Sequence, residues 1–301
     1  MIVRRTNHHA MLNFCTAQNT LDDIEAHLFA DIFGADHKVL ELVELNEAND
    51  TIRCWRFNDQ AQLIKEMDNR PSFWPYEMGW HSIARPSSKV YTFKYNNAGV
   101  LDSILEVHTS EGKVLNTTHT YTYPNKNTFT KSHNLNFGKL MEYDFEFTQI
   151  IIDSQIQEIR EKVKNHFSDG YLETVQISKY CYNNELKLKN IDRYFKVNNC
   201  PLRDEEEMVE ALAAHSAYSY DNLNRLEEIL ELGYDEEGKG ELSRALTFSY
   251  EGDSKSVRRI KVQYGKNVSF SESVYEVEYE NNGDLKSISI NGETHRYVYI
   301  R

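Results

Sequence analysis

The stretch Tyr218-Ser-Tyr-Asp-Asn-Leu-Asn-Arg-Leu-Glu-Glu-Ile229 carries the residue spacing that decides the fold. Two aromatic side chains at positions i and i+2 lie on the same face of a β-strand. The polar run that follows them ends at Asn224, a residue type that tolerates the positive φ of a tight turn. Leu226 and Ile229 then return toward the face that carries the aromatics. The pattern therefore predicts a β-hairpin with one apolar face.

The same spacing recurs from Phe93 to Ile104 and from Val277 to Ile288. In all three stretches, Gly or Asn comes four residues after the last aromatic of the pair, Leu comes six after it and Ile nine after it. Successive aromatic steps begin about 24 to 38 residues apart, a period typical of repeat architectures. Looser copies stand at Tyr121-Thr-Tyr123, Phe145-Glu-Phe147, Tyr180-Cys-Tyr182 and Phe248-Ser-Tyr250.

We therefore expect a mainly β protein (α+β overall), with an antiparallel hairpin-repeat sheet and three or four short amphipathic helices. Residues 1–88 are expected to form a mixed α+β N-terminal region, and residues 89–301 the Tyr-rich β-hairpin repeat region. Within the first region, 39–45 and 51–57 are predicted to pair as a hairpin across a polar turn.

Four segments have the spacing of amphipathic helices. The segment 153–167 carries Ile156, Ile159, Val163 and Phe167 at helical intervals. The segment 204–214 begins with an Asp followed three residues later by a Glu, as in a capping box. Residues 20–34 and 59–67 complete the set.

Composition fits a folded protein of 301 residues, with 40% hydrophobic and 27% charged residues, 19 Tyr and 14 Phe. No apolar stretch reaches the length of a signal-peptide core or a transmembrane helix. The four cysteines, Cys15, Cys54, Cys181 and Cys200, are scattered and are expected to be reduced thiols. These features predict a cytoplasmic protein with no membrane partner.

The formal charge of −13 is concentrated in one part of the chain. Between Asp204 and Leu242, thirteen acidic residues stand against Arg225 and Lys239. Such a segment repels nucleic-acid phosphates and attracts a basic protein. We expect a basic protein partner, for example a toxin domain, and no nucleic acid. The alternative is that the run is a solvated face that keeps the protein in solution.

One stretch also resembles a known repeat family. The pattern Tyr-x-Tyr-Asp-x-x-Asn-x-Leu from Tyr218 to Leu226 resembles the YD repeat of Rhs-type proteins. The stretches from Phe93 to Leu101 and from Val277 to Leu285 are similar, with Asn or Glu in place of Asp. Members of that family use such repeats to build large β-sheet shells around toxin cargo. The resemblance implies hairpin geometry and an association with polymorphic toxin systems.

Motifs for catalysis or metal binding do not emerge from the sequence. None of the eleven histidines fits a zinc pattern, and there is no nucleophile elbow, P-loop or dinucleotide fingerprint. We therefore predict no catalytic residues, no metal and no cofactor. A carbohydrate-active enzyme stays open as an alternative, because its two acids need no local motif. The aromatic stretch from Phe73 to Trp80 could line a sugar groove or plug a joint between substructures.

These observations lead to the hypothesis of a non-enzymatic protein-binding module, most specifically an immunity protein that neutralises a basic effector toxin through an acidic surface. A structural or adaptor β-repeat protein is the first alternative. Aromatic anchors are included because interface energy concentrates in Trp, Tyr and Arg. The candidate partner-binding residues are Glu205, Glu206, Glu207, Asp235, Glu236, Glu237, Trp74, Tyr76 and Trp80.

Overall fold

The structure is a computed structural model, and it describes residues 39–70, 86–125, 128–136, 142–153, 155–167, 170–199, 210–235, 237–265, 272–290 and 292–301. Within these ranges every regular element is a strand, labelled β1 to β18, and there is no helix. By their contacts, the residues divide into two compact units. Unit 1 comprises Met1–Glu66, Ser249–Ile260 and Val274–Arg301, and unit 2 comprises Met67–Phe248 and Lys261–Ser273.

Unit 1 brings the two ends of the described chain together in one antiparallel arrangement. Strand β1 lies between β2 and β18, so that Leu42 stands opposite both Trp55 and Tyr299. Leu42, Trp55 and Ile288 are buried completely or almost so, and they form the core of this unit. Its strands are β1 (Glu41–Leu45), β2 (Thr51–Phe57), most of β3 (Leu63–Asp68), most of β16 (Glu272–Tyr279), β17 (Leu285–Ile290) and β18 (Glu293–Ile300).

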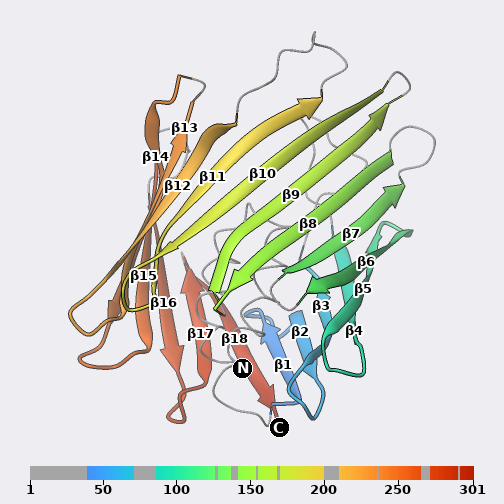
Figure 1. Ribbon diagram of the computed structural model, residues 1–301. Helices are drawn as coiled ribbons and strands as arrows, with labels where there is room; N and C mark the ends of the chain where they lie inside the picture. The colour runs from blue at the N-terminus through green and yellow to red at the C-terminus, as the bar shows by residue number, and fades with distance from the viewer. Residues whose placement is uncertain are drawn as a thin grey trace. The chain divides into compact units, whose positions relative to one another are not determined.

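Unit 2 is a meander in which each strand from β4 to β14 pairs antiparallel with the next one along the chain (Figure 1). Such consecutive pairing needs only short turns. The strands are β4 (Ser87–Tyr95), β5 (Leu101–Ser110), β6 (Lys113–Asn125), β7 (Thr128–Asn136), β8 (Glu142–Ile152), β9 (Gln155–Phe167), β10 (Gly170–Tyr182), β11 (Leu188–Asn199), β12 (Ala211–Tyr220), β13 (Leu226–Tyr234) and β14 (Gly240–Tyr250). Strand β15 (Val257–Tyr264) has residues in both units.

The predicted hairpin-repeat sheet is confirmed in its register. The residue pairs Phe93 and Ile104, Tyr218 and Ile229, and Val277 and Ile288 stand directly opposite each other. The looser copy at Tyr180 pairs with Ile191 in the same way. The predicted pairing of residues 39–45 with 51–57 is also found, as β1 and β2. The recurring sequence spacing therefore reflects one recurring cross-strand contact.

A five-residue turn closes these hairpins, and Asn183 shows its geometry. The backbone N–H of Asn183 donates to the carbonyl of Lys187 at 2.8 Å, and Leu186 N–H donates to the carbonyl of Asn183 at 3.0 Å. The side-chain Oδ1 of Asn183 accepts two further bonds of 2.9 Å, from the backbone N–H groups of Glu185 and Lys187. The same paired side-chain bonds occur at Asn58, Asn96, Asp221 and Asp235.

The fourth residue of each turn adopts a positive φ. Gly99 and Asn224 occupy this position at +70° and +68°, as expected for residue types that tolerate the left-handed region. Leu186 occupies it at +63°. For a leucine this conformation costs roughly 1 to 2 kcal/mol.

Tyrosine hydroxyls tie neighbouring strands together beside the turns. Tyr123 Oη donates to the carbonyl of Leu101 at 2.7 Å, and Tyr220 Oη donates to the carbonyl of Leu188 at 2.9 Å. Both acceptors are the leucine that opens the returning strand of the preceding hairpin. The recurring Tyr and Leu spacing within one hairpin thus also serves the contact to the next.

The predicted helices are wrong wherever the structure describes them. The segment 153–167 is a turn followed by strand β9, which pairs along its length with β8 and β10. Its apolar residues misled the prediction because Ile159 and Val163 are four apart, a spacing that puts them on one face of a strand as well as of a helix. Their β-branched side chains favour the strand.

The remaining helix predictions are also wrong where the structure describes the residues, and some of them fall on residues outside the described ranges. The segment 59–67 forms a turn and then strand β3, and residues 211–214 of the segment 204–214 belong to β12. Residues 204–209 and the predicted helix at 20–34 lie outside the described residues. The division expected between residues 88 and 89 stays a prediction.

The turn geometry makes a direct prediction for Asn183. Replacing it with alanine (Asn183→Ala) removes two side-chain bonds to backbone N–H groups, and should lower the free energy of unfolding by about 1 kcal/mol. Asn184→Ala is the matched control, because this neighbouring side chain is exposed. Urea denaturation followed by circular dichroism measures both. Equal stabilities for the two variants would contradict the role given to Asn183.

Candidate functional site

The predicted partner-binding residues are only partly described. Glu205, Glu206, Glu207, Glu236, Trp74, Tyr76 and Trp80 lie outside the described residues. Asp235 and Glu237 lie in the turn between β13 and β14, and both are exposed. The structure therefore brings these two together and leaves the rest of the predicted surface untested.

Asp235 has a local role that the sequence reading did not assign. Its Oδ1 accepts the backbone N–H groups of Glu237 at 3.1 Å and Lys239 at 2.8 Å, as Asn183 does in its own turn. Its carboxylate thus closes the β13–β14 turn. Glu237 is exposed and has no ion pair within the described residues, so its charge is available to a partner.

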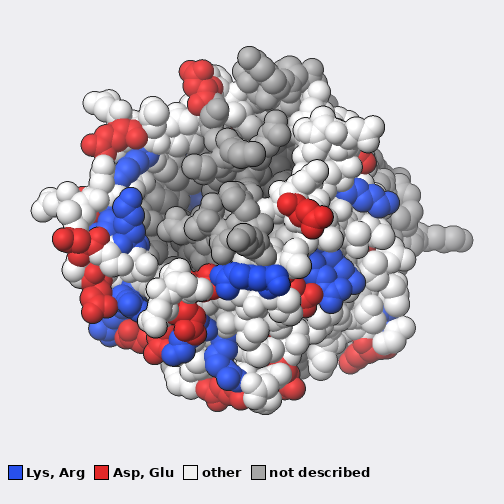
Figure 2. Space-filling model, turned by 90° about the horizontal axis from the view of Figure 1, so that it is seen from below, with Lys and Arg blue, Asp and Glu red and all other residues white. Residues whose placement is uncertain are grey.

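Charged side chains elsewhere are mixed rather than segregated by sign. Figure 2 shows acidic and basic side chains interleaved over the face in view. Several are cross-strand or local pairs, such as Arg225 with Asp221 at 2.6 Å and Lys286 with Glu278 at 2.9 Å. The Lys286–Glu278 pair is exposed, and exposed pairs contribute little to stability. Glu227 and Glu228 at the start of β13 are exposed acidic side chains that take part in none of these pairs.

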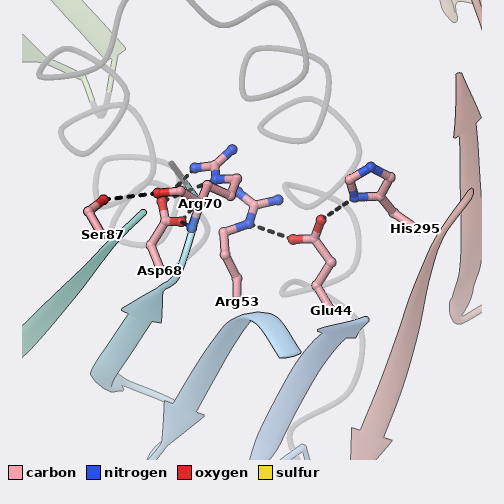
Figure 3. Close-up of polar contacts among 6 residues, drawn as sticks. All are labelled: Glu44, Arg53, Asp68, Arg70, Ser87 and His295. Atoms are coloured by element: carbon pink, nitrogen blue, oxygen red, sulfur yellow. Dashed lines mark hydrogen bonds and ion pairs between the residues drawn. The ribbon is translucent and has the colours of Figure 1, made fainter. Parts of the chain in front are cut away.

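The most deeply buried charged cluster lies in unit 1 and consists of Glu44, Arg53 and His295. Glu44 on β1 has no exposed surface, and Arg53 stands directly opposite it on β2. Arg53 Nε lies 2.5 Å from one carboxylate oxygen, and His295 Nδ1 on β18 lies 2.6 Å from the other (Figure 3). The strand pairing of β1 with both β2 and β18 positions all three groups.

Electrostatics keep Glu44 ionised inside this cluster. Burial alone would raise the pKa of the Glu44 carboxyl, but the charge of Arg53 and the hydrogen bonds from His295 and Arg53 outweigh it, so the pKa is lowered. Arg53 also lies over the ring of Trp55, with 4.8 Å from the guanidinium carbon to the ring centre. An acid and a base already bonded to each other in the core are typical of a structural ion pair.

Two smaller polar clusters belong to unit 2. Arg70 donates to both carboxylate oxygens of Asp68, with Nη2 at 2.7 Å from Oδ2, and Ser87 Oγ donates to the Arg70 carbonyl at 3.1 Å (Figure 3). On β5 and β6, His119 Nε2 lies 3.2 Å from Glu106 Oε2. Burial raises the pKa of Glu106, but contact with His119 outweighs this and lowers it.

Among the described ranges, no three His, Cys, Asp or Glu side chains lie close enough to hold one ion together. In the part of the chain that the structure describes, no helix has the length and apolar character of a membrane span.

Sequence reasoning missed the Glu44 cluster because its members are distant in the chain. The one available signal was a carboxylate at an inward position of the β1 alternation, two residues after Leu42.

Comparison with known proteins gives a loose structural similarity only. No family model matches the sequence, and no curated protein matches it. A porin-like protein from Bacteroides uniformis ATCC 8492 is similar with a TM-score of 0.39 and 11% identity, covering 87% of this chain and 98% of that chain. The TcdB2-TccC3-TEV structure gives a TM-score of 0.26 and 11% identity, covering 88% of this chain and 13% of that one.

The buried cluster predicts a large effect of a single substitution. Glu44→Gln removes the buried negative charge to which Arg53 and His295 are bonded, which should cost about 3 to 5 kcal/mol of unfolding free energy. Glu41→Gln is the control, because Glu41 pairs with the exposed Arg56 across the same two strands. Guanidinium denaturation at pH 7 compares them, and a loss no greater than that of the control would contradict the assignment.

The same cluster sets a dependence on pH. Because the folded pKa of Glu44 is below its unfolded value, its contribution is present above about pH 4.3 and is lost as the pH falls through the folded pKa. Glu44→Gln should therefore flatten the fall in stability on acidification below that pH. Parallel stability curves for the wild type and the variant between pH 5 and the acid limit would argue against it.

Proposed function

We propose that this protein is a non-enzymatic protein-binding module that docks a basic protein partner through hairpin tips of unit 2. The observation that carries the proposal is Leu186. It holds a left-handed backbone conformation with φ of +63°, and its side chain is 72% exposed. The left-handed conformation is unfavourable for leucine, whereas Gly99 and Asn224 occupy the same position of their turns with little strain. Strain retained at an exposed residue is a feature of functional sites.

Two neighbouring tips present aliphatic side chains as well. Ile152 ends β8 beside the β8–β9 turn, and Leu223 lies in the β12–β13 turn; each is about half exposed. Side-chain bonds hold these tips together. Gln155 Nε2 donates to the Leu186 carbonyl at 3.1 Å, and Asn224 Nδ2 donates to Glu185 Oε2 at 2.7 Å. We name Ile152, Leu186 and Leu223 the tip patch. A preorganised patch of this kind lowers the entropy lost on binding.

Charge favours a basic partner. Within the described part of the segment 210–242, the exposed Glu227, Glu228 and Glu237 have no ion pair, and the chain as a whole carries −13. Long-range attraction would speed encounter, and the apolar tips would supply short-range affinity.

The resemblance of Tyr218 to Leu226 to the YD repeat supports a more specific form of the proposal. In this form the protein is an immunity protein that neutralises a basic effector toxin of a Rhs-type polymorphic toxin system, acting in the cytoplasm. A structural or adaptor role would use the same hairpins but would not depend on the acidic surface.

The tip patch can be tested by separating binding from stability. Leu186→Asn should raise the free energy of unfolding by about 0.5 to 1 kcal/mol, because Asn tolerates the left-handed region better. The triple change Ile152→Thr, Leu186→Asn, Leu223→Asn should abolish retention of a specific basic protein in affinity capture from the native cell, read by mass spectrometry. Val114→Asn is the matched control, since Val114 is 60% exposed at the opposite ends of the strands.

A captured protein that the triple variant retains as well as the wild type would contradict docking at the tips. Charge reversal at Glu227, Glu228 and Glu237 tests the electrostatic part, and it spares Asp235 because that carboxylate closes a turn. The charge reversal should slow association with the captured partner about tenfold at low salt, and it should flatten the salt dependence of the association rate. Unchanged association kinetics with the captured partner would remove the acidic surface from the mechanism.

A further inference from the structure

Arg193 on β11 lies among hydroxyl groups from the two neighbouring strands. Ser178 on β10 stands directly opposite Arg193, and Ser216 on β12 stands opposite Ile191, two residues away on the same strand. Residues opposite one another, and residues two apart along a strand, share one face of a sheet. Tyr180 and Tyr218 are each two residues further along this face. We name these five residues the Arg193 cluster.

The guanidinium of Arg193 is incompletely matched within the described part of the chain. Its Nη1 donates to Ser216 Oγ at 2.7 Å, and no carboxylate among the described residues pairs with it. The nearby carboxylate of Glu231 is already bonded to Arg244 at 2.8 Å. A half-buried arginine with spare donors in its planar fork is an unsatisfied cation, which is costly unless an anion meets it.

A second observation points to a ligand at the same place. Ser178 is 1% exposed, and its Oγ has no hydrogen-bond partner. Buried hydroxyls are nearly always bonded in proteins, so an unpartnered one calls for an explanation. Ser178 stands opposite Arg193, and its hydroxyl can donate to a group held by the guanidinium.

The phenols complete a set of donors. Burial raises the pKa of Tyr218 to about 12, although Arg193 opposes this, and burial likewise raises the pKa of Tyr180. Both phenols therefore stay protonated at neutral pH and can donate. Donors thus come from three adjacent strands around the charge of Arg193. Of the two carboxylates that act on the phenols, Glu231 is paired with Arg244, and Glu161 accepts a hydrogen bond from Gln176 Nε2 at 3.2 Å.

We propose that the Arg193 cluster binds a phosphate-type oxyanion. Arg193 would supply charge and paired N–H donors, while Ser178 and the two phenols would donate to the remaining oxygens. A tetrahedral oxyanion suits donors that converge from several strands better than a planar carboxylate, which the arginine fork alone would satisfy. The site is separate from the tip patch and does not depend on the proposed function.

Isothermal titration of the full chain with inorganic phosphate tests the site, with sodium chloride at equal ionic strength as the blank. One phosphate should bind per chain, and Arg193→Gln should weaken binding by about tenfold or more, since a charge-assisted bond is worth at least that factor. Ser178→Ala should weaken it by a smaller factor. Arg160→Gln is the matched control, because Arg160 is exposed and pairs with Glu158 on the neighbouring part of β9.

Stability without phosphate separates a ligand site from a structural arginine. If Arg193 serves a ligand, Arg193→Gln should leave the unfolding temperature unchanged or raise it, and phosphate should raise it in the wild type alone. No heat of binding in the wild type, equal binding by Arg193→Gln, or a preference for acetate over phosphate would each overturn the proposal.

Discussion

A single side-chain oxygen that accepts two backbone N–H groups fixes the register of the hairpins whose turns begin at Asn96, Asn183, Asp221 or Asp235. At Asn183 and Asp221 this oxygen bonds the second and fourth residues after it, so the chain reverses over five residues. A strand pair cannot slip by one residue without breaking these bonds, and such a slip would turn every side chain to the wrong face. The opposed pairs Phe93 and Ile104, or Tyr218 and Ile229, follow from that constraint.

Contacts between hairpins use the same residues a second time. The tyrosine that precedes a turn packs on its own hairpin and, through its hydroxyl, bonds the backbone of the neighbouring strand, as Tyr220 does with Leu188 and Tyr182 with Ile156. Burial of these phenols would be unfavourable without an acceptor, so the hydroxyl contacts make aromatic side chains acceptable beside the turns. One sequence unit therefore specifies both the fold of its own hairpin and the position of that hairpin against the neighbouring hairpin.

This local encoding explains how much of the structure could be predicted from the sequence. The hairpins at Phe93, Tyr218 and Val277 were predictable because turn residues and opposed apolar residues stand within a dozen positions of one another. Strand β9 was not, since the spacing of Ile159 and Val163 fits both periods and pairing with β8 and β10 decides between them. The Glu44 cluster depends on His295, which reaches β1 only through the pairing of β18, and no local pattern reports that. Likewise, the Arg193 cluster draws on three strands, and their alignment is seen only in the pairing of β11 with β10 and β12.

Closure of the turns at Asn96, Asn183, Asp221 and Asp235 by their own side chains has a consequence for how such a chain can change in length. Because β4 to β14 pair only in chain order, a duplication or loss of one whole hairpin would leave every other turn and its adjoining register intact. Insertion or deletion of one or two residues inside a turn would instead leave the acceptor oxygen without its backbone N–H donors. It would also shift the register of the two strands that the turn joins. Related chains should therefore differ in size by steps of two strands, and their lengths should cluster at those steps rather than vary continuously.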